Sequence, residues 1–451
     1  MKIFISILLA VFIFSAPPVI YAEIKLGGEM SIAGRQGHNF DLNKRLLNPG
    51  RNGEGQYYEQ TVRLQLDVTV SPNLKAFIEM QHEGSDTATW GISGAGDTSH
   101  QGYQGVQSRY FGSLRQAWML YTGRGLGFPS GLKIGHQLFI LGNGVFYDST
   151  KYGNDAIVFF MDPAKETHIR LITIKVNEGT SNINDDTNGY IGVITHRLGE
   201  NHKIGLDVSQ LRKQNSGRAT TAYKKTTTLS NIGITADGEF IGLGYSLDLQ
   251  LQSGKGDNTA SLGTVAARDA NISATENIKY SGMAALLGLS KKINIFTIKL
   301  EGAYGSGDKS GSTNKMEAFQ AFLGDDPRYT FIYENRVGQS GYSTTGGDWI
   351  VNFGLSNTTY GRFGITADLL KNLTAVINIF KLRATKALNI ANVSTGSSRD
   401  LGYEYDLSIN YAIADGLDYS IKYGYFKPGS FYDRTPKNSA WALDHGLSMR
   451  F

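Results

Sequence analysis

Two carboxylates lie two residues apart near the C-terminus, at Glu404 and Asp406. Paired carboxylates on one face of a strand can perform general acid–base chemistry. The chain has no cysteine, no Gly-x-Ser-x-Gly motif, and eight histidines without metal-ligand spacing. Because Lys422 falls on a neighbouring segment, ion pairing within a sheet explains the two acids better than catalysis. The sequence therefore predicts a protein that is not an enzyme, with no metal site and no cofactor.

The two acids belong to a wider pattern in which apolar and polar residues alternate along many segments. In residues 239–252, Leu243 and Leu249 alternate with Gly244, Asp248 and their polar neighbours. A period of two is typical of a strand that is wetted on one face only. The same pattern recurs along the whole chain and predicts an all-β protein.

Eighteen segments show this character and are separated by turn or loop residues. They are residues 24–34, 56–70, 74–83, 108–122, 131–141, 154–161, 167–177, 188–198, 202–213, 226–236, 239–252, 278–290, 294–304, 358–370, 373–385, 399–411, 417–427 and 440–451. Connections after even-numbered segments are short, and most after odd-numbered ones are long and polar, the longest spanning residues 305–357. This parity predicts a transmembrane antiparallel β-barrel of about 18 strands with both termini in the periplasm.

Individual segments also allow local predictions. Tight turns are expected at Asp237-Gly238 and at Lys291-Lys292. In residues 108–122, Leu114, Trp118 and Leu120 are expected to share one face. Residues 167–177 alternate poorly, and their faces cannot be assigned from the sequence.

The N-terminus indicates secretion. Lys2 precedes an apolar run that is too short to span a bilayer as a helix, and residues 1–22 are predicted to be a signal peptide. Residues 23–451 then form a single transmembrane β-barrel domain in the bacterial outer membrane, with membrane lipid as its surroundings. The formal net charge of +4 does not favour nucleic acid as a partner.

Charged faces of such a barrel must point into a water-filled interior, because a charge on the lipid face costs roughly 2–4 kcal/mol at the midplane. We therefore expect the channel to be lined by Arg63, Asp67, Glu79, Arg109, Arg115, Asp207, Asp248, Lys299, Glu301, Arg362, Asp368, Glu404, Asp406, Lys422, Asp444 and Arg450. Acids and bases nearly balance in this set, whereas a channel for a polyanion such as alginate is expected to have an excess of Arg and Lys. The alternative role for each residue is an ion pair that keeps the wall wet.

Motifs in the C-terminal third resemble known families. The last strand, Trp441–Phe451, ends in an aromatic residue and resembles the closing strand of bacterial outer-membrane barrels, which implies recognition of Phe451 by the barrel-assembly machinery. Residues 303–308 (Ala-Tyr-Gly-Ser-Gly-Asp), 401–407 (Leu-Gly-Tyr-Glu-Tyr-Asp-Leu) and 423–429 (Tyr-Gly-Tyr-Phe-Lys-Pro-Gly) resemble the alginate-export family. The resemblance implies an eighteen-stranded, monomeric, porin-like channel.

Two functions remain open at this point. The first is an outer-membrane channel for passive diffusion or export of small hydrophilic solutes or saccharides. The second is a barrel sheath around a multihaem cytochrome, whose haem would belong to a periplasmic or cytochrome partner because this chain has no cysteine. The aromatic-rich loop 305–357 is expected either to enter the pore as a constriction or to lie above it as a lid.

Overall fold

The computed structural model describes residues 22–40, 42, 55–82, 113–177, 186–214, 226–257, 277–307, 315–323, 329–334, 354–387, 398–432 and 438–451. All but the last residue of the expected signal peptide lie outside these ranges. Within them, no helix has the length and apolar character needed to cross a bilayer.

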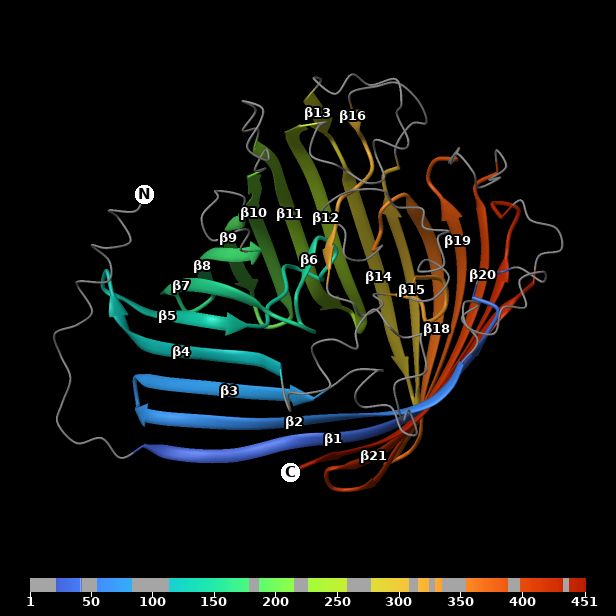
Figure 1. The fold of residues 1–451 in the computed structure, drawn as a ribbon, viewed down its shortest axis with the longest axis horizontal. Helices are drawn as coiled ribbons and strands as arrows, with labels where there is room; N and C mark the ends of the chain where they lie inside the picture. Colours follow the sequence, from blue (N-terminus) through green and yellow to red (C-terminus); the bar gives the residue numbers. More distant parts are fainter. Residues whose placement is uncertain are drawn as a thin grey trace, which may run out of the picture.

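Eighteen antiparallel strands form a closed barrel (Figure 1). They are β1 (Glu23–His38), β2 (Gly55–Ser71), β3 (Leu74–His82), β4 (Ser113–Gly125), β5 (Phe128–Gln137), β7 (Asn154–Ala164), β8 (Thr167–Asn177), β9 (Thr187–Leu198), β10 (His202–Gln214), β11 (Thr226–Phe240), β12 (Leu243–Asp257), β14 (Met283–Ile293), β15 (Phe296–Gly305), β18 (Thr358–Leu370), β19 (Leu373–Ala384), β20 (Asp400–Ala414), β21 (Leu417–Pro428) and β22 (Ala440–Arg450). Each pairs with the next, and β13 (Asn277–Tyr280) precedes β14 along the same edge of β12.

The barrel closes where the two ends of the chain meet. β1 pairs with β22 over ten residues, from Glu29 opposite Arg450 to His38 opposite Trp441. The backbone of Phe451 exchanges two hydrogen bonds with Gly28, of 2.9 and 3.1 Å. Closure leaves no long strand edge to associate with another chain.

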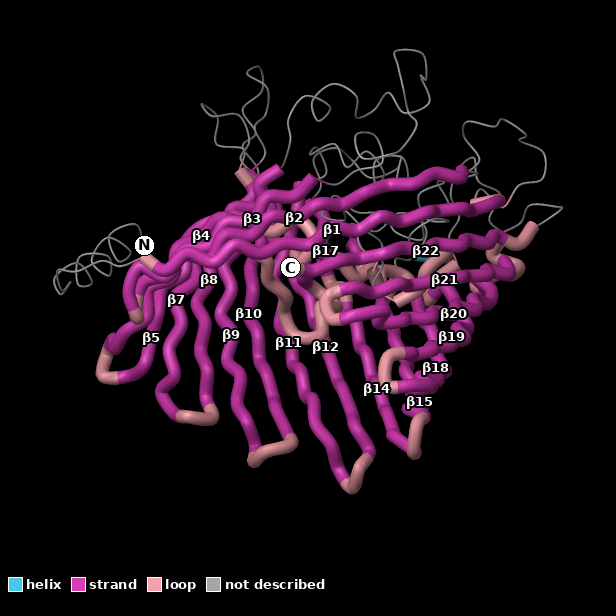
Figure 2. The backbone as a smooth tube through the Cα atoms, turned by 90° about the horizontal axis from the view of Figure 1, so that it is seen from below, coloured by secondary structure: helices cyan, strands magenta, loops and turns pink. Residues whose placement is uncertain are grey.

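Short hairpin turns gather at one end of the barrel (Figure 2). Two of them differ in position from the sequence prediction. The turn between β11 and β12 lies at Ile241-Gly242 rather than at Asp237-Gly238, and the next lies at residues 294–295 rather than at Lys291-Lys292. Ile241 and Gly242 both have positive φ (51° and 67°), as a two-residue type I′ hairpin requires. Moving each turn outward lets both strands form additional pairs.

Exposure follows the expected alternation. Leu243, Leu249 and Tyr405 are 41%, 37% and 42% exposed on the outer face. Asp248 and Glu404, on the opposite face of the same strands, are fully buried. The outer wall is therefore apolar and the inner face carries the charges.

A β-bulge changes the faces in β4. The register against β3 skips Arg115, so that Gln116 pairs with Glu79 while Leu114 pairs with Met80. As a result, Trp118 and Leu120 face inward opposite Phe77 and Lys75, whereas Leu114 is exposed on the outer face. The prediction that these three residues share one face was wrong, because the extra residue of a bulge inverts the alternation beyond it.

The poor alternation of β8 also has a structural cause. Leu171 faces outward, while Ile172 and Ile174 are buried on the inner face. They belong to the same apolar cluster as Leu141 and Phe146, which lie in the connection between β5 and β7. Both faces of β8 therefore carry large apolar residues, since lipid covers one face of this wall and the chain itself covers the other.

Gly402 is expected to be essential for a tight bulge in β20. Its φ is +119°, and a Cβ there would lie 2.1 Å from the carbonyl oxygen of Lys427. Gly402→Ala is expected to lower the free energy of unfolding by about 1–3 kcal/mol, measured by urea-induced unfolding in lipid vesicles. Gly302→Ala is the matched control because nothing lies within 4 Å of the added methyl group. Equal stability of the two variants would contradict the expectation.

Candidate functional site

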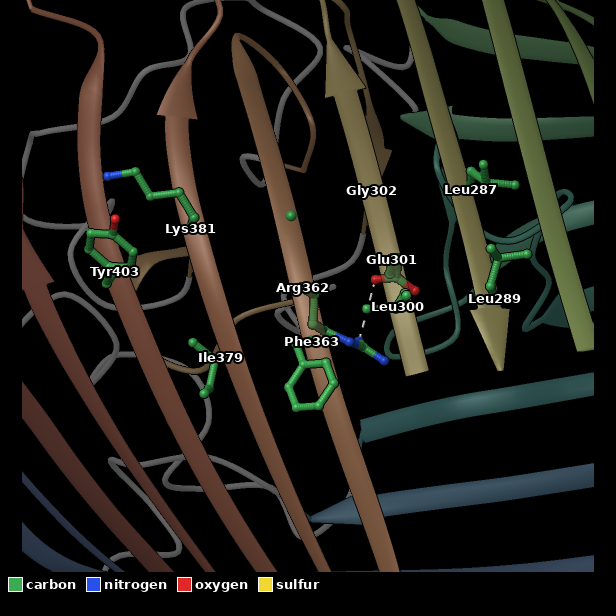
Figure 3. A pocket seen from close by; sticks show the side chains of 11 residues that line it. Leu287, Leu289, Leu300, Glu301, Gly302, Arg362, Phe363, Ile379, Lys381 and Tyr403 are labelled. Carbon is green, nitrogen blue, oxygen red and sulfur yellow. Dashed lines mark ion pairs between the residues drawn. The ribbon is translucent and has the colours of Figure 1, made fainter. Parts of the chain in front are cut away.

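The inner wall of the barrel carries charges that are largely paired with one another. Arg63 on β2 lies 3.1 Å from Glu29 on β1. Glu301 on β15 lies 3.0 Å from Lys299 and 3.4 Å from Arg362 on β18 (Figure 3). Ion pairs therefore neutralise much of the charge on this part of the wall.

The same strands show how the two faces divide. On the outer side, Leu300, Phe363 and Ile379 border an apolar hollow of about 470 Å³ (Figure 3). The hollow lies over Gly302 and Gly361, which pair across β15 and β18 and present no side chain.

Three stretches of chain leave the wall and pack against the inner face. The first is the connection between β5 and β7, which contains β6 (Tyr147–Asp148). The backbone N–H of Asn143 donates to Asp248 Oδ2 over 2.8 Å, and its side chain donates to the Leu247 carbonyl over 3.4 Å. Because Asp248 lies well inside β12, the connection reaches deep into the barrel.

The base of this connection is held by Arg115 on β4. Its guanidinium donates to the carbonyls of Lys151 (2.9 Å) and Thr150 (2.6 Å) and forms an ion pair with Glu79. One arginine thus joins the wall to the inward chain. Burial raises the pKa of Tyr147, so that its hydroxyl stays neutral and donates to Asn154.

The second stretch is residues 315–323, in the connection between β15 and β18. It contains β16 (Lys315–Met316) and β17 (Phe322–Leu323), and β17 pairs with β6. Gln252 on β12 and the backbone of Gln320 exchange two hydrogen bonds of 2.7 and 2.9 Å. Phe319 is fully buried against Phe146, with ring centroids 6.5 Å apart. The first and second stretches therefore form one packed body on the β11–β12 side of the interior.

The third stretch is residues 329–334, from the same connection. The Glu404 carboxylate on β20 accepts hydrogen bonds from three consecutive backbone N–H groups, those of Phe331 (2.7 Å), Ile332 (2.6 Å) and Tyr333 (2.8 Å). Charge-assisted bonds of this kind are the strong ones in proteins. Glu404 therefore acts as an anchor that holds this stretch against the wall.

Aromatic contacts reinforce the anchor. Tyr329 stacks on Tyr360 of β18 at 4.5 Å. The Lys422 ammonium of β21 lies 4.3 Å from the centre of the Phe331 ring, in cation–π geometry. The described parts of the loop 305–357 thus pack against the inner face of the barrel.

The structure places the sequence-predicted residues in three groups. Asp248, Glu404, Asp406, Lys422 and Arg115 surround the inward stretches. Arg63, Asp67, Glu79, Asp207, Lys299, Glu301, Arg362 and Asp444 lie along the inner wall. Asp368 and Arg450 lie at the short-turn end, in ion pairs with Lys292 (3.2 Å) and Asp418 (2.5 Å). Arg109 lies outside the described residues.

Sequence reasoning missed the uncharged residues of the site. Asn143, Gln252 and Gln320 join the inward stretches to the wall through amide groups. Gly142 also approaches closely, since a Cβ there would lie 2.5 Å from Thr235 Cγ2. Asn143 lies between two glycines, Gly142 and Gly144, and this Gly-Asn-Gly run is a local sequence sign of the close contact.

A search of curated proteins returned no match. The sequence profile described as "Alginate export" matches residues 25–442. The chain belongs to the alginate-export family.

Solved porins share the fold of this alginate-export family barrel. OccK9 (OpdG) of Pseudomonas aeruginosa aligns with a TM-score of 0.57 at 12% identity, covering 95% of this chain and 98% of the porin. OpdK of the same organism, in a structure titled with vanillate, aligns with a TM-score of 0.53 at 12% identity and the same coverage. OccD1 (OprD) gives 0.53 at 10% identity, covering 95% of both chains. This alginate-export family member thus has the β-barrel fold of outer-membrane porins.

Proposed function

We propose that the protein is a passive channel for small hydrophilic solutes and that the three inward stretches build its narrowest part. The observation that carries this proposal is the Glu404 anchor together with the Asn143–Asp248 contact. These contacts fix inward chain to two sectors of wall that are separated by β14, β15, β18 and β19. Chain held at two such sectors narrows the path and sets the size of the solute that passes.

The charges of the inner wall are proposed to line that path. They occur in both signs and are mostly paired, as in the Lys299–Glu301–Arg362 group. A wall of this kind keeps the path wet without selecting strongly for one sign of ion. Small neutral saccharides and weakly charged solutes suit it better than a long polyanion.

The purified protein in planar bilayers tests the proposal. We expect stepwise conductance with a weak ratio of cation to anion permeability, and liposome swelling rates that fall as the saccharide grows. A bilayer without current steps, or equal swelling for monosaccharides and large oligosaccharides, would contradict it.

The alternative function, a sheath around a multihaem cytochrome, requires a wide and open interior. Residues 315–323 and 329–334 occupy part of that interior and are fixed there by hydrogen bonds. The channel is therefore the better-supported function. Stoichiometric co-purification of a haem protein from native membranes would reverse this order.

We also propose that the barrel-assembly machinery recognises the C-terminal strand through Phe451. The Phe451 side chain is 62% exposed on the outside of the closing seam, where a partner can reach it. Deletion of Phe451 is expected to lower the amount of heat-modifiable, folded protein in the outer membrane several-fold. Leu447→Ala, on the same face of β22, is the control and is expected to have little effect.

A further inference from the structure

A row of exposed cations crosses the end of the barrel opposite the short turns, on β10, β12 and the short strands β13 and β16. Arg212 on β10 pairs in register with Thr228 on β11, and Thr228 pairs with Lys255 on β12. Lys255 pairs with Lys279 on β13, and Lys279 pairs with Lys315 on β16. All four cations are exposed. We refer to Arg212, Lys255, Lys279 and Lys315 as the basic row.

Arg212 and Lys255 lie on the membrane-facing side of the wall, and Lys279 pairs directly with Lys255. Val208 on β10 and Leu251 on β12 are on the same faces as Arg212 and Lys255 and are 51% and 57% exposed. His202 and Tyr245 stack near the short-turn end of these strands. Ten residues separate His202 from Arg212, about 33 Å along a strand, which a tilt of about 40° reduces to roughly 25 Å, the height of the apolar band of a membrane barrel. The row therefore meets the bilayer at the level of the headgroups.

Among the side chains that the structure describes, no acidic group lies within ion-pair distance of these four cations. Other cations on the outer face have an acidic partner: Lys175 lies 2.6 Å from Asp186, and Lys381 lies 2.5 Å from Asp400. Four cations along one row create a local positive potential that favours an anion from the surroundings.

A hollow with a largely apolar floor and several polar side chains on its rim lies directly beside the row. It measures about 310 Å³ and opens on the outer face of β9 to β12. Its rim includes the polar side chains of Tyr190, Gln210, Ser230 and Ser253. These residues pair in register with one another and lie two residues closer to the short-turn end than the basic row. Hydroxyl and amide groups facing a bilayer lack water to bind, so they favour a ligand that offers hydroxyl groups of its own.

We propose that the basic row and this hollow together bind the phosphorylated sugar headgroup of a membrane glycolipid. The cations take the phosphates, and the hydroxyl and amide groups of the hollow take the sugar hydroxyls. Val208, Ile232 and Leu251 contact the start of the acyl chains. The lipid binds outside the lumen, so this site is separate from the solute path.

Native mass spectrometry of the full-length barrel in detergent tests the proposal, with bisphosphorylated lipid A, its dephosphorylated form and phosphatidylethanolamine as probes. The test variant is the triple substitution Arg212→Gln, Lys255→Gln and Lys279→Gln. The matched control is Lys165→Gln, Lys291→Gln and Lys371→Gln, which removes three charges at the short-turn end. Heat-modifiable migration and single-channel conductance show that each variant is folded and open.

We expect the wild-type protein and the control to retain bisphosphorylated lipid A at least tenfold better than the test variant. Dephosphorylated lipid A and phosphatidylethanolamine are expected to bind the wild-type protein as weakly as the test variant binds lipid A. Equal retention by the test variant, or by the dephosphorylated lipid, would overturn the proposal. Conductance is expected to be unchanged in the test variant, which separates this inference from the proposed channel function.

Discussion

Replacing residues 316–334 by a short Gly-Ser linker is expected to raise the single-channel conductance several-fold. This replacement removes the Gln320 contacts with Gln252, the Phe319–Phe146 packing and the stretch held by Glu404. The interior then loses two of its three inward stretches, so that the cross-section open to ions increases. Planar-bilayer recording measures the conductance, and liposome swelling with oligosaccharides measures the size limit.

The matched control is the same replacement in residues 388–397, which connect β19 to β20 at the same end of the barrel. Its conductance is expected to stay close to that of the wild-type protein. If both replacements raised the conductance equally, the effect would belong to the rim of the barrel and not to the inward stretches. An unchanged conductance in the first variant would show that residues 316–334 do not limit the path.

Glu404→Gln is expected to loosen the same constriction without removing any chain. One carboxylate oxygen of Glu404 accepts from the N–H groups of Phe331 and Ile332, and the other accepts from that of Tyr333. In Gln, an NH₂ group replaces one of these oxygens and faces backbone N–H donors that it cannot accept from. Each hydrogen bond to a charged group contributes roughly 1.5–3 kcal/mol, and an unsatisfied buried donor costs about 1–3 kcal/mol. An arrangement in which residues 329–334 are released from the wall therefore becomes more populated. We expect a noisier current with a higher mean conductance.

Glu29→Gln is the control for this substitution, since Glu29 is an inner-face carboxylate that bonds Arg63 and Ser448 and not the inward stretches. The sharper test combines the two predictions. If Glu404 acts through residues 329–334, Glu404→Gln has no further effect in the linker variant, because coupled sites are not additive. An effect of the same size in both backgrounds would assign Glu404 a direct electrostatic role in the path instead.

Alternation with a period of two is enough to predict the barrel architecture, because it shows which residues of each strand face lipid. All eighteen predicted segments contain the core of an observed wall strand, and Glu404, Asp406 and Asp248 lie on the inner face as expected. The alternation matches the two faces of the wall because a lipid-facing charge costs too much free energy to occur often near the midplane. The pattern is therefore local and can be read one strand at a time.

This local rule fails where contacts between distant segments change which residues of a strand face the interior. The bulge at Arg115 adds one residue to β4 and turns Trp118 and Leu120 to the inner face. Only the pairing of β4 with β3 shows this bulge. At Ile172 and Ile174 the inner face is apolar because distant chain covers it. The partnership of Glu404 with residues more than 70 positions earlier is likewise a product of folding. Contacts between segments far apart in the chain leave no period in the sequence, so the place of the inward stretches is set only by the way the connections pack inside the closed barrel.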